Sequence, residues 1–227
     1  MSYELLSVVP WGRTLKEYKA MFKLTNEDIK KEIASFGDGP ASFNSEMNKL
    51  KNNVTSFDPI YGFTKEQILN RIIETKEIVM KQTEENKENF IWTTIKNLEE
   101  LEKMRMEAMY NFIDDFEKGK VEKRYITHEL PNKTIFHDKH FDIGLSSHFL
   151  LLYSNLGLDF HIKSIDEMLR ICNEVRIFPI LDLNANESSL LKPIIEKYNK
   201  SYVVEIEKTN YIFQKDGDKM LTIRRIH

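Results

Sequence analysis

A glycine-containing turn and a later aspartate are the residues whose types and spacing best suit ligand chemistry. The turn, Gly-Asp-Gly at 37–39, follows the short apolar run 33–36, and Asp58 follows the next such run, 54–57, 21 residues after the first glycine. Glycines let the backbone approach a ligand closely. An acidic residue about 20 residues beyond a glycine turn is placed to accept hydrogen bonds from both ribose hydroxyls. This spacing predicts a nucleoside-binding site.

Two residues close to the glycine turn, Pro40 and Ser42, limit the kind of nucleotide that this site could bind. A dinucleotide fingerprint requires glycine or alanine where this chain has Ser42, and no Gly-Lys-Ser/Thr phosphate loop is present. Pro40 removes an N–H where a pyrophosphate would need a donor. The pattern therefore favours a nucleoside without a pyrophosphate.

The elements that must position these residues follow from short, continuous apolar runs, which are typical of a parallel sheet covered on both faces. Helical patterns separate the later runs, and Asp216-Gly217 is a hairpin signal between the last two. Strand-like runs lie at 33–36, 54–57, 124–127, 141–146, 175–180, 202–214 and 220–226, with helical patterns at 159–172 and 187–199. The order predicts βαβ units followed by an antiparallel hairpin.

The chain is predicted to be a single domain, 1–227, with an N-terminal helical cap at about 1–30 and a helical insertion at about 64–118. The cap begins at Thr14-x-x-Glu17 and the insertion at Thr64-x-x-Gln67, both of which match the capping box. Apolar residues recur at helical spacing through the insertion, between dense lysine and glutamate, as in amphipathic surface helices.

Composition excludes several classes of function. The 227 residues carry 33 basic and 36 acidic side chains, a net charge of −3, which argues against non-specific binding to nucleic acid or to an anionic membrane. No stretch approaches the apolar length that a membrane span needs, and the first residues do not resemble a secretory signal. The single cysteine, Cys172, indicates a reducing, cytoplasmic compartment and excludes a cysteine-based zinc site.

Several motifs together resemble the class I S-adenosylmethionine-dependent methyltransferases, and in particular a poorly characterised bacterial group. The matching stretches cover almost the whole chain: Val9–Arg13 (VPWGR), Gly37–Asn44 (GDGPASFN), Phe141–Phe149, Glu174–Pro179 and Met220-Leu221. The resemblance implies a Rossmann-like α/β fold, a mostly parallel seven-stranded sheet with a terminal antiparallel hairpin. It also implies S-adenosylmethionine as the methyl donor and S-adenosylhomocysteine as the product.

The resemblance further implies roles for individual residues at the ends of the strands. Gly37, Asp38 and Gly39 are expected to line the methionine part of the donor, and Asp58 to hold its ribose. Pro59, His128 and Glu129 are expected beside the adenine, Ser146 near the sulfonium, and Arg13 on the methionine carboxylate. Ser35 stands where most of the superfamily has an acid, and Asp38 is expected to take over contacts to the ammonium group.

Three further side chains are candidates for the acceptor side. His148 follows the fourth strand and has an ordinary pKa near neutrality, so it is either a general base or a residue that caps or packs under the lid. Trp11 and Tyr153 either contact the acceptor or belong to the core. The cluster His137-Asp138-Lys139-His140 is interpreted as a solvated loop, and no metal site is predicted.

Three functions remain open on the sequence. A small-molecule methyltransferase is favoured because the insertion lengthens the edge of the sheet where specificity is usually built. A methyltransferase for RNA or protein would need a basic face, whereas the insertion mixes both charges. A non-catalytic S-adenosylmethionine-binding or interaction protein is the third, since Ser35 departs from the common pattern.

Overall fold

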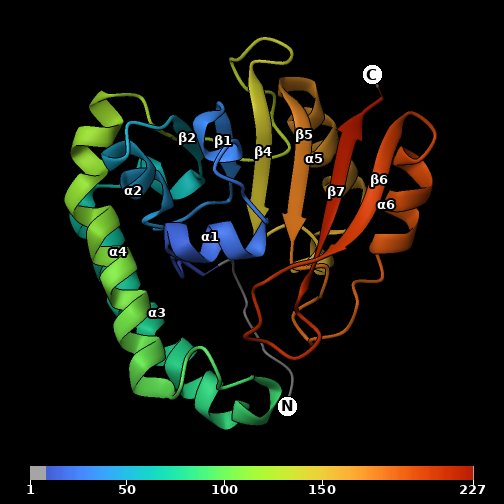
Figure 1. Cartoon of the computed structure of the whole chain (residues 1–227). Coiled ribbons are helices and arrows are strands. Elements are labelled where there is room, and N and C mark those ends of the chain that lie inside the picture. The colour runs from blue at the N-terminus through green and yellow to red at the C-terminus, as the bar shows by residue number, and fades with distance from the viewer. Residues whose placement is uncertain (1–8, 227) are drawn as a thin grey trace.

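A computed structural model describes residues 9–226 of the chain. It contains a seven-stranded sheet with helices on both faces (Figure 1). The strands are β1 (Ile33–Phe36), β2 (Val54–Phe57), β3 (Tyr125–Ile126), β4 (Phe141–Ser147), β5 (Cys172–Phe178), β6 (Tyr202–Lys208) and β7 (Lys219–Arg225). The α-helices are α1 (Leu15–Met21), α2 (Phe43–Lys49), α3 (Lys65–Glu85), α4 (Leu98–Val121), α5 (Leu158–Ile171) and α6 (Leu191–Tyr198).

The strand order is β3-β2-β1-β4-β5-β7-β6. Strands β1 to β5 run parallel, whereas β7 pairs antiparallel with both β5 and β6. This confirms the predicted mostly parallel α/β sheet with a terminal antiparallel hairpin. The chain proceeds from β1 to β2 on one side and later to β4 on the other, so strand order reverses between β1 and β4. In open sheets, ligands bind at the carboxyl ends of the strands at such a point.

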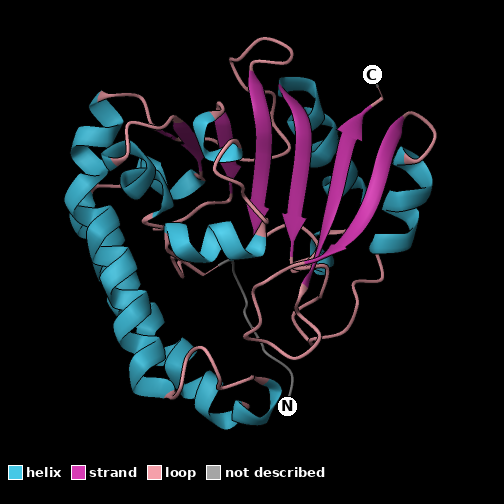
Figure 2. Cartoon of the chain, in the orientation of Figure 1, coloured by secondary structure: helices cyan, strands magenta, loops and turns pink. Residues whose placement is uncertain are grey.

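Helices cover both faces of the sheet (Figure 2), and alternating side chains of the strands enter two different cores. In β1, Ala34 and Phe36 join the core formed with α5 and α6, whereas Ile33 joins the core formed with α1 and α2. Because both faces are covered, nearly every residue of the inner strands β1, β2 and β4 is buried. This explains why their sequence pattern is continuous rather than alternating.

Helices α3 and α4 form a long antiparallel pair along one side of the sheet and reach beyond the carboxyl ends of β4 and β5 (Figure 1). Both sequence-predicted capping boxes are formed: Thr14 caps α1 with Glu17, and Thr64 caps α3 with Gln67. The start of α3 and the second half of α4 pack on β3 through a third apolar cluster, which includes Tyr61. No helix within residues 9–226 is long and apolar enough to cross a bilayer.

The sequence-based boundaries differ from the structure at several places. The third strand has only two residues, β5 begins at Cys172, and residues 209–214 leave the sheet instead of extending β6. Helix α2, which was not predicted, follows the glycine turn directly. Part of the predicted cap at 1–30 lies outside the described residues.

Candidate functional site

A cavity of about 470 Å³ lies at the carboxyl ends of β1, β2, β4 and β5. Its other walls come from residues 9–13, from α3 and α4, and from the loop joining β6 to β7. Its size suits a small organic ligand. Of the twelve side chains singled out in the sequence, the structure places eleven on its wall: Trp11, Arg13, Gly37, Asp38, Gly39, Asp58, Pro59, His128, Glu129, His148 and Tyr153.

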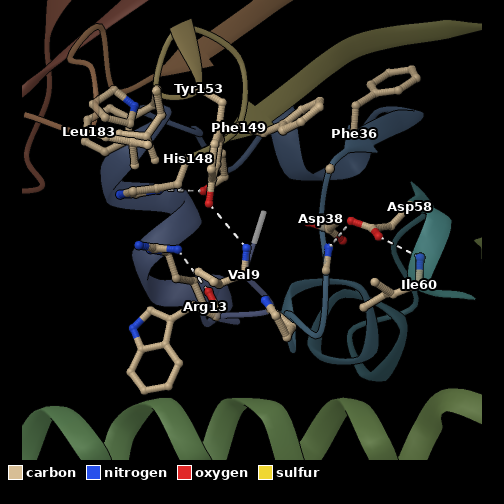
Figure 3. Close-up of a pocket in the computed structure, with 18 of the residues that line it drawn as sticks. Val9, Arg13, Phe36, Asp38, Asp58, Ile60, His148, Phe149, Tyr153 and Leu183 are labelled. Carbon is tan, nitrogen blue, oxygen red and sulfur yellow. Dashed lines mark hydrogen bonds between the residues drawn. The ribbon is translucent and has the colours of Figure 1, made fainter. Parts of the chain in front are cut away.

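Asp58 follows β2 and is buried at the cavity wall. Its Oδ2 accepts a hydrogen bond from the Gly39 N–H at 2.9 Å, and its Oδ1 accepts one from the Ile60 N–H at 2.9 Å (Figure 3). Burial raises the pKa of Asp58 to about 6, although these two N–H donors oppose the shift. Among the described residues it has no basic partner. A carboxylate can accept about four hydrogen bonds, so acceptor sites remain for a ligand's hydroxyl groups.

Asp38 is held by hydroxyl groups of the protein itself. Its carboxylate accepts hydrogen bonds from the hydroxyls of Ser35 at 2.6 Å and Ser56 at 2.5 Å, and also from Tyr18. Ser35, the departure from the family pattern, therefore donates to an acid three residues later in the chain. These three internal donors hold the Asp38 carboxylate and fix the glycine turn. Asp38 also lies on the cavity wall, so its contact with the donor's ammonium group stays a prediction.

The two glycines of the turn have backbone conformations with positive φ, +62° at Gly37 and +56° at Gly39. A Cβ on Gly37 would lie 2.7 Å from the Phe149 ring. A Cβ on Gly39 would meet no atom within 4 Å, in agreement with its position on the cavity wall. This turn thus brings backbone, rather than side chains, up to the space a ligand would occupy.

The residues expected beside adenine gather at the Asp58 end of the cavity. Pro59 and Glu129 are exposed, and His128 is half-buried. The His128 Nε2 is buried without a hydrogen-bond partner among the described residues. Burial lowers the pKa of His128, so the ring is neutral near pH 7.

Arg13 lies on the opposite side of the cavity from Asp58, near His148 (Figure 3). Its Nη1 donates to the Trp11 carbonyl at 3.0 Å, its single hydrogen bond among the described residues, and its buried Nε has no partner. Burial and the nearby Arg105 charge lower the pKa of Arg13. Arg13 is half-buried, and although Glu17 attracts it, its guanidinium forms no ion pair with a carboxylate among the described residues. An anionic ligand group would supply such a partner.

A buried ion pair that the sequence analysis did not identify adjoins Arg13. The Arg105 Nη1 on α4 donates to both Glu17 oxygens on α1, at 2.6 and 2.8 Å, and its Nη2 donates to the Tyr211 hydroxyl at 3.2 Å. Arg105 is 1% exposed, and its Nε has no partner. Burial lowers the pKa of Arg105, but the attraction of Glu17 and Tyr211 outweighs it, so the net shift is upward. The group joins three segments that lie far apart in the sequence.

His148 lies at the end of β4, with φ at +51°. Its Nδ1 is 3.0 Å from the Ser147 hydroxyl, and its ring meets that of Phe178 edge-on, with centroids 5.4 Å apart. Burial and the charges of Arg13 and Arg105 hold the pKa of His148 well below its usual range. The ring is therefore neutral at pH 7 and is a weak base there.

Ser146 does not line the cavity, contrary to the sequence-based expectation. It is fully buried, and its hydroxyl accepts a hydrogen bond from the Leu150 N–H at 3.3 Å. Successive side chains of a strand point to opposite faces. Its neighbour Ser147 lies on the cavity wall instead.

Trp11 and Tyr153 come from segments on either side of the cavity. The Tyr153 hydroxyl accepts a hydrogen bond from the Val9 N–H at 3.3 Å, so it holds residues 9–13 in place. Tyr153 is 4% exposed, which makes it a core residue that also faces the ligand space. Trp11 is half-buried beside the helical pair.

No cluster of three metal-ligating side chains occurs among residues 9–226. His137 and His140 interact with each other through ring nitrogens 2.8 Å apart, in an exposed loop. Arg176 is buried and paired with Glu174 at 2.5 Å, as expected for a buried arginine on a strand.

No protein-family model matches the sequence. The chain is 40% identical over 223 residues to the uncharacterized protein MJ0045 of Methanocaldococcus jannaschii, covering 97% of this chain and 98% of that protein. Because that organism is an archaeon, the relative does not support the expected bacterial group. Among solved structures, the chain is similar to a putative S-adenosyl-L-methionine-dependent methyltransferase from Methanococcus maripaludis, with a TM-score of 0.42 and 10% identity over 94% of this chain and 84% of that one. It is also similar to an S-adenosylmethionine-dependent methyltransferase from Aquifex aeolicus, with a TM-score of 0.41 and 12% identity over 92% of each chain.

Proposed function

This chain belongs to the same family as the uncharacterized protein MJ0045 of Methanocaldococcus jannaschii, and we propose that it is an S-adenosylmethionine-dependent methyltransferase that acts on a small molecule. The observation that carries this proposal is the Asp58 carboxylate. It is buried at the end of β2, beside the glycine turn, with no basic partner among the described residues and with acceptor sites left for ligand hydroxyls.

The chemistry of the cavity wall fits the donor from end to end. Asp58 would accept hydrogen bonds from the ribose hydroxyls, and His128 would lie beside the adenine. The turn at 37–39 would lie along the methionine chain. Arg13, whose guanidinium lacks an anionic partner among the described residues, would bind the carboxylate.

When bound, S-adenosylmethionine supplies an electrophilic methyl group on a sulfonium. The protein's share of catalysis is then mainly orientation of the two reactants and exclusion of water. The aromatic and aliphatic residues of the wall make the cavity apolar on the acceptor side. His148 offers a neutral ring nitrogen to orient the acceptor atom.

A small acceptor is favoured over RNA or protein because α3, α4 and the loop joining β6 to β7 cover the cavity. A macromolecule would need an open, charged surface at this edge of the sheet. Helices α3 and α4 together carry 12 acidic and 8 basic residues, so they offer no basic surface for nucleic acid. The buried Cys172 cannot form an internal disulfide, which supports a cytoplasmic location.

Calorimetric titration with S-adenosylmethionine and S-adenosylhomocysteine tests the proposal, with ATP and NAD as controls. We expect binding of the first two alone. Asp58→Ala should weaken that binding by about 1–3 kcal/mol through loss of charge-assisted hydrogen bonds. If S-adenosylhomocysteine does not bind, or if Asp58→Ala leaves its affinity unchanged, the proposal is wrong. Binding without methyl transfer to any small molecule would favour the non-catalytic alternative.

A further inference from the structure

Resting on the proposed function, we propose that the methyl acceptor is a small aromatic molecule that reacts through an ionised oxygen. Its place would be the half of the cavity between Arg13, Arg105 and a set of aromatic side chains, which we name the aromatic wall. The wall consists of Phe90, Phe178, Tyr211 and Phe213.

The aromatic wall presents flat rings from three separate segments. Phe90, from the α3–α4 connection, stacks on Phe213, from the loop joining β6 to β7, with ring centroids 4.9 Å apart. Phe178, at the end of β5, meets Tyr211 edge-on at 5.7 Å. Faces and edges of this kind bind planar ring systems well. A ring-bearing acceptor fits this wall better than a flexible polar one.

Backbone hydrogen bonds join two segments of the wall in this half of the cavity. The Ile91 N–H donates to the Phe213 carbonyl at 2.7 Å, and the Lys215 N–H donates to the Asn89 carbonyl at 3.0 Å. The α3–α4 connection is therefore fastened to the loop joining β6 to β7. The occupant must be small enough to fit beneath these bonds.

The charges beside the aromatic wall leave a positive excess. Arg13 and Arg105 both line the cavity, and each has a buried Nε without a partner among the described residues, while Glu17 is the acid that pairs with Arg105. Asp38 and Asp58 lie across the cavity (Figure 3). Burial keeps the pKa values of the nearby tyrosine hydroxyls above their usual range, so these add no negative charge: Tyr18, Tyr153 and Tyr211.

This excess persists when the donor is present, because its carboxylate would offset the charge of Arg13, whereas its ammonium and its sulfonium would each add one positive charge. A protonated amine would be repelled from such a site, whereas an oxyanion would be attracted to it. Burial, together with the charges of Arg13 and Arg105, depresses the pKa of His148, which makes that residue a poor proton acceptor. The nucleophile must therefore be ionised before transfer. The acceptor oxygen then forms a bond to the methyl carbon, the carbon–sulfur bond breaks with its electron pair staying on sulfur, and no proton leaves in that step.

4-Nitrophenol is a suitable probe because its ionised form absorbs visible light and its pKa lies near neutrality. Its absorbance would be titrated with the protein across pH, with and without S-adenosylhomocysteine. We expect the ionised form to bind about tenfold more tightly than the neutral form, so that the pKa of the bound probe falls by about one unit. 4-Nitrobenzylamine, of the same shape but cationic, should bind at least tenfold more weakly.

Three variants test whether Arg13 is responsible. Arg13→Gln should lose most of the pKa shift of the probe, and Arg13→Lys should keep most of it because the charge remains. Arg71→Gln removes an exposed arginine of α3 that pairs with Glu74, and it should change nothing. Binding of uncharged 4-nitroanisole to Arg13→Gln shows that the cavity is still folded.

The outcomes separate this inference from the proposed function. If S-adenosylhomocysteine binds but 4-nitrophenol does not bind, or binds with a raised pKa, the acceptor class is wrong and the methyltransferase proposal stands. Equal binding of the amine and the phenol likewise overturns the acceptor class. If S-adenosylhomocysteine itself does not bind, the proposed function fails, whatever the probe shows.

Discussion

Binding of S-adenosylhomocysteine should weaken about tenfold between pH 8 and pH 5 because Asp58 must be ionised to accept hydrogen bonds from ribose. Burial raises the pKa of this carboxyl to about 6 in the free protein. The nearby Asp38 charge also raises it, whereas the hydrogen bonds from the two backbone N–H groups lower it. Hydroxyl groups that donate to a carboxylate favour its charged form. The complex should therefore have a lower Asp58 pKa than the free protein, and binding should release a proton.

The sign and size of the effect follow from this difference. As the pH falls through about 6, the free protein takes up a proton on Asp58, and this proton must be removed before the ligand binds. At pH 5, about one-tenth of the molecules carry the ionised group, which corresponds to a loss of about 1.4 kcal/mol in binding free energy. Above pH 7 the group is ionised already, so the affinity should level off.

Isothermal titration calorimetry at pH 5, 6, 7 and 8 measures this dependence. Repeating the pH 6 titration in two buffers with different heats of ionisation counts the released protons. Asp58→Asn is the matched control: its affinity should be lower at pH 8 and nearly constant across the range. A wild-type affinity that is flat, or that rises on acidification, would refute the assignment of Asp58, and a slope that survives in Asp58→Asn would show that another group titrates.

Three substitutions test other parts of the site. His148→Asn should slow turnover at least tenfold while S-adenosylhomocysteine affinity stays within about twofold, because the neutral ring orients the acceptor atom; equal loss of both would indicate a structural role. Arg105→Met should lower the free energy of unfolding by about 3–5 kcal/mol, measured by chemical denaturation, because the Glu17 carboxylate would be left buried without its basic partner; a loss below about 1 kcal/mol would contradict the buried pair. Gly37→Ala should abolish cofactor binding in calorimetry while the far-UV circular dichroism is kept, since its Cβ would collide with Phe149 at a positive φ; unchanged binding would show that the turn can shift.

Local patterns in the sequence were sufficient to predict the sheet and the end of the site at which Asp58 lies. Short apolar runs predict strands because both faces of this sheet are covered, and Thr14 and Thr64 begin helices through bonds to residues only three positions away. The Gly37 turn and Asp58 were found because each directly follows a strand. The carboxyl ends of adjacent parallel strands meet at one edge.

Other parts of the site depend on which face of an element a residue occupies. Ser146 was expected at the cavity, but the pleat of β4 places Ser147 there instead. A shift of one residue changes the face, and apolar runs without alternation do not specify it. Asp38 likewise follows its strand as expected, yet Ser35, Ser56 and Tyr18 occupy its carboxylate.

The group of charged and polar side chains beside Arg13 was decided by tertiary structure alone. From the sequence alone, Glu17 is interpreted as a capping residue, Arg105 as one charge among many on an amphipathic helix, and Tyr211 as part of a strand. Their hydrogen bonds span 88 to 194 residues of sequence. No local spacing encodes such contacts, because they exist only when the helical pair and the terminal hairpin close over the same edge of the sheet. The sequence by itself thus determined the strands and the ribose end of the site, while the packing of distant segments decided which charges the acceptor would meet.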